Sequence, residues 1–222
     1  MKRFLFFAFL ILGPGSHAVF GQEDTLTQRK IFVVSGMGWG LTGGQTAEVL
    51  TPKFSSNLGL DIALRNPRYF VYPSMDFLVF GYDQQVADPD HAYSLERGRS
   101  NFYNLNLAVG IRQQLRPVSA YAFAGPGIGV VSEPRAHVPE GQSVVKIENT
   151  YHLTPSVRAG LGADIKLGSF YLFLEGAWLH NFSSMQDRPV HVVSIYGGLK
   201  TDVTRLAGHV TRAIGLDAGI AP

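Results

Sequence analysis

Apolar and polar residues alternate along eight stretches of the chain between positions 30 and 200. Successive side chains of a β-strand point to opposite faces, so this two-residue period predicts strands with one apolar and one polar face. The predicted strands cover residues 30–40, 54–65, 69–82, 101–115, 119–132, 151–166, 170–180 and 190–200. Pro73 and Pro126 fall inside two of these stretches and predict bulges or kinks, because proline donates no hydrogen bond to a neighbouring strand.

The gaps between the predicted strands alternate in length. Three short gaps cover Asn66 to Arg68, Arg116 to Val118 and Leu167 to Ser169. Four long polar gaps cover Leu41 to Lys53, Asp83 to Ser100, Glu133 to Thr150 and Asn181 to Pro189. Short turns at one rim and long loops at the other are typical of barrels in bacterial outer membranes.

Three features favour a membrane barrel over a soluble sandwich or a lipocalin-like barrel. The predicted strands have about 10–15 residues, against about 5–6 in most soluble sheets. Their polar faces carry mostly Gly, Ala, Ser and Asn, as a narrow barrel interior requires. Aromatic residues gather at the strand ends, where two membrane interfaces would lie. The residues predicted for these interfaces are Trp39, Tyr69, Tyr72, Tyr103, Tyr121, Phe123, Tyr171 and Trp178. We therefore predict an all-β fold, an eight-stranded antiparallel up-and-down transmembrane β-barrel.

The ends of the chain predict export and a short tail. A basic start at Lys2 and Arg3, an apolar run over residues 4–12 and small residues before position 22 predict a signal peptide over 1–21. The barrel domain then covers 22–200. Residues 201–222 are expected to form a peripheral periplasmic tail, with an amphipathic helix or a ninth strand as alternatives.

Composition excludes some classes of protein. Charged residues make up only 16% of the chain, which is low for a soluble domain. Cleavage at position 21 would remove two of 19 basic residues and none of 17 acidic ones, leaving 17 of each and no net charge. Because the chain also has no Lys/Arg-rich run, nucleic acid is excluded as a partner. The chain has no cysteine, so neither lipoprotein acylation nor a disulfide framework is expected.

The stretches Leu-Asn-Leu-Ala-Val-Gly at 105–110 and Ser-Ile-Tyr-Gly-Gly-Leu-Lys at 194–200 resemble the strands of small outer-membrane barrels. With the predicted signal peptide and loop rhythm, the chain resembles the OmpX-like and OmpA-membrane-domain-like barrels. It looks most like the "outer membrane protein beta-barrel domain" proteins common in Bacteroidetes. The resemblance implies an integral outer-membrane protein of a Gram-negative bacterium with both chain ends in the periplasm. It departs from many such proteins in continuing past the last strand to Pro222.

Charged residues on the polar faces are candidates for the barrel interior. We predict that they form a buried ion-pair network that fills the lumen, because an eight-stranded barrel is just wide enough for its own side chains. The alternative is a narrow polar conduit or a small-ligand site. The predicted residues are Asp61, Arg65, Asp76, Arg112, Arg158, Asp164, Lys166, Glu175 and Lys200.

Catalysis and metal binding have less support. A lipid-modifying enzyme would use His180, Ser183, Ser184 and His191 with Glu175, but Glu175 and His180 would point to opposite faces of a regular strand. No two histidines have a ligand spacing such as HxH or HExxH, so no metal site is predicted. The glycine-rich stretch 125–129 lies inside a strand and indicates a tight interior position instead of a phosphate loop.

Function is therefore expected at the long loops, since rigid barrels commonly carry it there. We predict a non-enzymatic protein with a structural, adhesion or interaction role, with a porin-like conduit as the alternative and a lipid-modifying enzyme third. Residues 144–147 could extend the third loop as a hairpin above the membrane. Expected partners are outer-membrane lipids including lipopolysaccharide, the barrel-insertion machinery and an extracellular or envelope protein. No cofactor is expected.

Overall fold

The computed structural model describes residues 30–84, 95–115, 117–137, 145–186 and 188–204. The predicted signal peptide at 1–21 and most of the predicted tail at 201–222 lie outside the described residues. So does the middle of the second predicted loop, Asp83 to Ser100.

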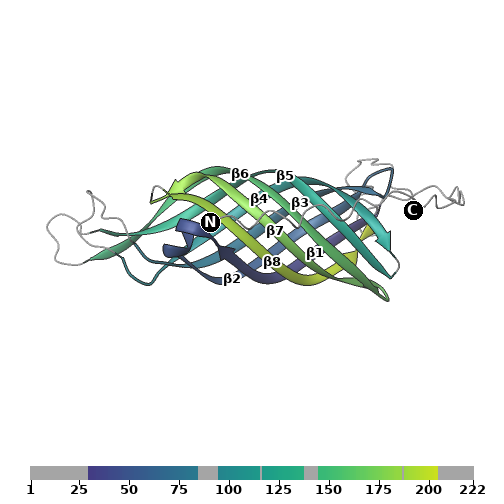
Figure 1. Ribbon diagram of the computed structural model, residues 1–222, viewed down its shortest axis with the longest axis horizontal. Coiled ribbons are helices and arrows are strands. Elements are labelled where there is room, and N and C mark those ends of the chain that lie inside the picture. The colour runs from purple at the N-terminus through teal and green to yellow at the C-terminus, as the bar shows by residue number, and fades with distance from the viewer. Residues whose placement is uncertain (1–29, 85–94, 116, 138–144, 187, 205–222) are drawn as a thin grey trace, which may run out of the picture.

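Eight antiparallel strands form one closed barrel in which each strand pairs with its neighbours in sequence and the last pairs with the first (Figure 1). The predicted fold is confirmed. A short 3-10 helix, η1 (Gly44–Glu48), follows the first strand. No helix among the described residues is long and apolar enough to cross a membrane. The strands are β1 (Ile31–Thr42), β2 (Leu50–Ala63), β3 (Tyr69–Tyr82), β4 (Gly98–Leu115), β5 (Val118–His137), β6 (Lys146–Leu167), β7 (Phe170–Met185) and β8 (Arg188–Asp202).

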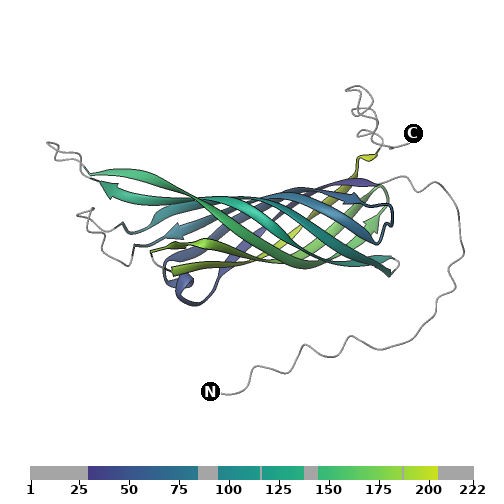
Figure 2. The ribbon, with the colours of Figure 1, turned by 90° about the horizontal axis from the view of Figure 1, so that it is seen from above.

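The strands are staggered around the barrel. A walk from Ile31 through directly paired residues of all eight strands returns to β1 at Leu41, ten residues further along. Such a stagger tilts the strands by roughly 35–45° from the barrel axis. Figure 2 shows this tilt, with the short turns and the described chain ends at one rim and the longer connections at the other.

The predicted long loops are shorter in the structure. The prediction of a fourth long loop over Asn181 to Pro189 is wrong, because most of this stretch is strand: β7 runs to Met185 and β8 begins at Arg188. A register shift between Asn181 and Ser184 lets these polar residues continue the hairpin. The hairpin predicted around residues 144–147 is confirmed for Lys146 and Ile147, since β5 reaches His137 and β6 begins at Lys146. Residue 144 lies outside the described residues.

The two prolines do not form the predicted bulges. Pro73 pairs in register with Leu107, and Pro126 with Val157. The ladders on their other sides, to β2 and β4, skip the prolines without a register shift. The observed register shifts lie between Pro52 and Ser55 and between Asn181 and Ser184. Pro73 and Pro126 fit because the long flanking ladders hold the register where one donor is missing.

The outward face of the barrel is a belt of exposed apolar side chains. On β4 it is formed by Leu105, Leu107 and Val109, which are 57–64% exposed. A soluble sandwich would instead bury this face. A closed sheet has no edge strand with unpaired backbone N–H and C=O groups, which lipid could not hydrogen-bond. Together with the apolar exterior, this makes the barrel suited to a membrane.

The inward face combines aromatic rings with glycines. A Cβ built on Gly110 would lie 2.2 Å from a ring atom of Phe70, and one on Gly160 would lie 2.5 Å from the ring of Phe123. Gly162 meets the ring of Tyr121 in the same way, at 2.5 Å. Because these glycines carry no side chain, the rings of neighbouring strands can lie directly against their backbone.

We expect Gly160→Ala to destabilise the barrel by about 1–3 kcal/mol, the usual cost of overpacking. The new methyl group would meet the Phe123 ring at 2.5 Å and the carbonyl oxygen of Gly176 at 2.7 Å. The free energy of unfolding in lipid bilayers, measured by denaturant titration, tests this. Gly197→Ala is the control, because its nearest neighbour would be 3.9 Å away. Equal stability of the two variants would contradict the proposed fit.

Candidate functional site

The candidate site is the barrel lumen with its two ends. Inward-facing residues form four successive zones from the short-turn end to the long-loop end: a charged pocket, a central ion-pair cluster, an apolar plug and a polar rim. Each zone draws on several strands, so closure of the sheet assembles it.

The central cluster is built around Arg158 on β6, which is 1% exposed. Its guanidinium lies 3.1 Å from the Asp76 carboxylate and 2.7 Å from the Glu175 carboxylate, and it donates to the Ser74 hydroxyl at 3.0 Å. It also lies over the Phe123 ring, 4.8 Å from the ring centroid. One cation and two carboxylates thus lie together away from bulk water.

Neutral side chains support both carboxylates of this cluster. Asn57 and Asn106 donate to Asp76 at 2.8 and 2.9 Å, and the Tyr121 hydroxyl donates to Glu175 at 3.0 Å. Buried charges need such hydrogen bonds to offset the loss of hydration. The arrangement therefore fills and crosslinks the middle of the lumen.

A second charged group lies at the short-turn end. The Lys200 ammonium is 2.9 Å from Asp164 and 3.5 Å from Asp61, and Arg112 also contacts the Asp61 carboxylate. Lys200 further lies 3.9 Å from the centroid of the Tyr121 ring. Basic and acidic residues from four strands, β2, β4, β6 and β8, therefore meet here.

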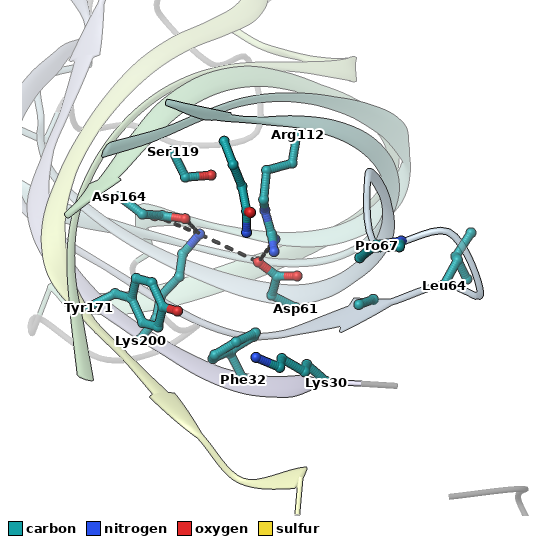
Figure 3. Close-up of a pocket in the computed structure, with 12 residues that line it drawn as sticks. Lys30, Phe32, Asp61, Leu64, Pro67, Arg112, Ser119, Asp164, Tyr171 and Lys200 are labelled. Carbon is teal, nitrogen blue, oxygen red and sulfur yellow. Dashed lines mark hydrogen bonds and ion pairs between the residues drawn. The ribbon is translucent and has the colours of Figure 1, made fainter. Parts of the chain in front are cut away.

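This group borders a pocket of about 260 Å³ that opens at the short-turn end (Figure 3). Some polar atoms beside it are buried without a hydrogen-bond partner among the described residues: Asp61 Oδ1, Arg112 Nε and Ser119 Oγ. The pocket can therefore hold water or a small polar solute. Lining residues include Lys30, Phe32, Asp61, Pro67, Arg112, Ser119, Asp164, Tyr171 and Lys200.

The structure brings together seven of the nine residues predicted for the lumen network. Arg65 and Lys166 are exposed instead, so their prediction as buried members of the network is wrong. Arg65 lies two residues after the end of β2, and Lys166 is the next-to-last residue of β6. Both therefore lie where the barrel wall ends and water reaches the side chain.

An apolar plug closes the lumen nearer the long-loop end, and the sequence did not predict it. Leu78, Phe80 and Phe102 are each 0% exposed at its centre. The signal for it was the weak alternation in 69–82, where both faces of the strand are apolar. The cluster comprises Val49, Leu50, Leu78, Phe80, Tyr82, Phe102, Val131, Leu179, Met185, Val190 and Val192.

A polar rim covers the plug. The Tyr82 hydroxyl donates to Glu133 at 2.7 Å and accepts from the Gln186 amide at 2.7 Å. Arg135 lies 3.2 Å from the same carboxylate, and His152 lies 3.7 Å from it. These contacts tie the base of the β5–β6 hairpin to β3 and to the β7–β8 turn.

The predicted interface aromatics divide into two groups. Trp39, Tyr69, Tyr103 and Trp178 are exposed on the outer surface, and their place at membrane interfaces stays a prediction. The prediction is wrong for the other four, which face inward: Tyr72, Tyr121, Phe123 and Tyr171. Large rings fill the narrow lumen, and an aromatic residue near a strand end can face either the lumen or the membrane interface. Its place near a strand end therefore does not determine which of the two it faces.

The predicted catalytic candidates do not converge. Glu175 is buried in the lumen, whereas His180 points outward, as their odd spacing indicated. Ser184 is exposed, and the side chain of Ser183 lies outside the described residues. The glycine-rich stretch 125–129 is strand, and a Cβ on Gly127 would lie 2.4 Å from the Asn106 amide oxygen. Its glycines therefore make room for polar side chains of the lumen.

No protein-family model and no curated protein matches the chain. Among solved structures it is similar to Neisserial surface protein A, with 10% identity over 77% of this chain and 96% of that one and a TM-score of 0.55. It is also similar to a major outer membrane protein from Thermus thermophilus, with 14% identity over 79% of this chain and 100% of that one and a TM-score of 0.59. At these identities the likeness shows the fold alone. The chain has the fold of the small eight-stranded outer-membrane barrels, and its apolar outer belt fits that location.

We expect Arg158→Met to destabilise the barrel by about 3–5 kcal/mol, because two buried carboxylates lose their cation. Denaturant unfolding in lipid bilayers measures this. Arg65→Met removes the same group from an exposed position and should change stability by less than about 0.5 kcal/mol.

A triple variant separates lost pairing from lost packing. Arg158→Met combined with Asp76→Asn and Glu175→Gln leaves no unpaired charge, so it should regain part of the lost stability. A triple variant less stable than Arg158→Met alone would contradict the ion-pair explanation.

Proposed function

We propose that this protein is a non-conducting, non-enzymatic outer-membrane barrel that anchors a binding surface at its long-loop end. The observation that carries the proposal is the closed lumen. The central ion pairs and the apolar plug occupy it in succession, and the pocket at the short-turn end leads into them. A barrel without a passage leaves its outer surface and loops as the places to act.

The β5–β6 hairpin is the main structure presented at that end. Its ladder runs unbroken from the pair Val118 and Ile165 to the pair His137 and Lys146. The paired region of β4 with β5 stops at Ser132, and that of β6 with β7 stops at Ser156. Above these levels the two strands pair only with each other among the described residues, and Figure 2 shows the hairpin extending past the rest of the wall.

The hairpin carries exposed apolar side chains where a solvated connector would be polar. Ile147, Tyr151 and Leu153 are 63%, 65% and 69% exposed, with Lys146 and Glu148 beside them. Exposed apolar residues with a polar border are typical of interaction sites, and an unpaired strand edge can accept a further strand. This supports a protein partner over a purely structural connector.

In the proposed topology the hairpin faces the cell exterior, and the short turns and both described chain ends face the periplasm. The contacts of Glu133 in the polar rim fix the base of the β5–β6 hairpin above the plug, so a partner would bind a preformed surface. The alternative function, a narrow conduit, would need a path through the plug.

Conductance tests the closed lumen. We expect the purified protein to show no stable, reproducible single-channel current in planar lipid bilayers, because apolar side chains fill the lumen. A large-pore porin added to the same bilayer is the positive control. Reproducible unitary currents would refute the plug and favour the conduit.

Site-specific photo-crosslinking tests the binding surface. A photoreactive amino acid at Ile147 should crosslink to a discrete protein on intact cells, whereas one at Leu161 should meet only lipid. The two positions are matched in exposure, at 63% and 69%, and both lie on β6. Protein crosslinks from Leu161 alone, or from neither position, would contradict a partner at the hairpin.

A further inference from the structure

His180 and His191 form a close pair on the outer surface. They are eleven positions apart in sequence, yet they lie directly opposite each other on β7 and β8. Their Nδ1 atoms are 3.1 Å apart, and their rings lie 4.5 Å apart at 17°. Neither residue contributes to the lumen, so the pair is independent of the site described above.

The pair lies towards the long-loop end of the apolar belt. One further exposed ring on β7, Phe182, follows it and packs edge-on against His180, with the ring centroids 4.7 Å apart. Below the pair on β7 the outward residues include Phe170, Leu172 and Trp178, all exposed. From Phe170 to His180 is ten residues, which at about 3.3 Å each and a tilt of about 40° spans roughly 25 Å. This equals the height of the apolar band of outer-membrane barrels, about 25 Å. The imidazoles therefore lie close to the boundary between lipid and water at the long-loop end.

We propose that His180 and His191 form a two-nitrogen chelate for a divalent transition-metal ion, with Cu²⁺ bound most tightly. Imidazole nitrogens bind such ions at about 2.0–2.1 Å, so two of them on one ion lie roughly 2.9–3.4 Å apart for square-planar to tetrahedral angles. The observed separation of 3.1 Å falls inside this range. The backbone ladder between β7 and β8 holds the two residues directly opposite each other, which keeps both imidazoles within reach of one ion.

Binding needs only a local adjustment. The rings are nearly parallel, so each must turn about its Cβ–Cγ bond until both Nδ1 lone pairs meet at the ion. This torsion is broad for histidine. In the bound state each neutral imidazole carries its proton on Nε2, so whichever residue donates in the Nδ1–Nδ1 hydrogen bond changes tautomer on binding.

The remaining coordination positions would be taken by oxygen. The described residues contain no group of three or more His, Cys, Asp or Glu side chains that could hold a metal. Water or the phosphate oxygens of neighbouring lipids would therefore complete the coordination. An ion held in this way can join the barrel wall to the lipid head groups.

Trp178 provides a local reporter of binding. Its ring is stacked on His180 at 6° with centroids 5.8 Å apart, and it also lies 6.3 Å from His191. Cu²⁺ quenches indole fluorescence at such distances. The chain has two tryptophans, so Trp39→Phe leaves Trp178 as the only emitter.

The test is a Cu²⁺ titration of the folded full-length Trp39→Phe protein in lipid nanodiscs. We expect saturable quenching of Trp178 that fits one site. Zn²⁺, which does not quench, should restore the emission when added in an excess large enough to offset the tighter binding of Cu²⁺. His180→Gln and His191→Gln should each weaken the apparent affinity at least about tenfold, a scale already reached when outer-shell partners of a metal are removed.

His152→Gln is the matched control, because His152 is exposed on the hairpin and lies apart from the pair. It should titrate like the parent. Quenching that does not saturate, that Zn²⁺ does not reverse, or that survives in the His180→Gln, His191→Gln double variant would overturn the proposal. The Zn²⁺ competition uses the unaltered pair, so the test stands even if a variant folds poorly.

Discussion

The closure of eight strands into one barrel is the constraint on which the rest of this structure depends. Lipid offers no partner for a free backbone N–H or C=O group, so the sheet must end on itself, as β8 does on β1. With eight strands and a stagger of ten residues, the interior has room only for side chains. Apart from the pocket at the short-turn end, the described inward-facing residues therefore form a packed core, although the outward face is apolar.

The core combines two kinds of packing. Rings such as Phe70 and Phe123 lie over glycines of neighbouring strands, which keeps the narrow wall free of clashes. The Arg158 guanidinium pairs with the Asp76 and Glu175 carboxylates, so these charged side chains of the polar strand faces compensate one another inside the barrel. Removing one charged member of this cluster leaves its partners unpaired and destabilises the barrel, since a buried carboxylate without its cation cannot regain hydration in the lumen.

The filled interior moves the question of function to the outside. The β5–β6 hairpin and the His180–His191 pair are unrelated in chemistry, but both lie at the long-loop end and both face away from the lumen. One offers exposed apolar side chains and a strand edge to a protein, and the other offers two nitrogens to a metal ion. A rigid barrel suits both, because the ladder that closes the wall also holds these groups in place.

The number of strands, the short turns and the two faces of most strands could be predicted from the sequence alone. A two-residue period is a local property, so it predicted that Leu105 points outward and that Arg158 and Glu175 point inward. It predicted seven of the nine lumen charges for the same reason. Which aromatic rings fill the lumen became clear only from the folded barrel, because alternation cannot distinguish two apolar faces. The prediction therefore misplaced Tyr72 and Tyr121.

The tertiary structure also decided every contact that depends on strand register. His180 and His191 have no ligand spacing in the sequence, and they meet because the β7–β8 ladder sets them opposite each other. The plug likewise gathers Leu78, Phe102 and Val192 from three strands, and no single stretch shows that they meet. The two-residue period is a property of a single strand, whereas register and closure depend on all eight strands together.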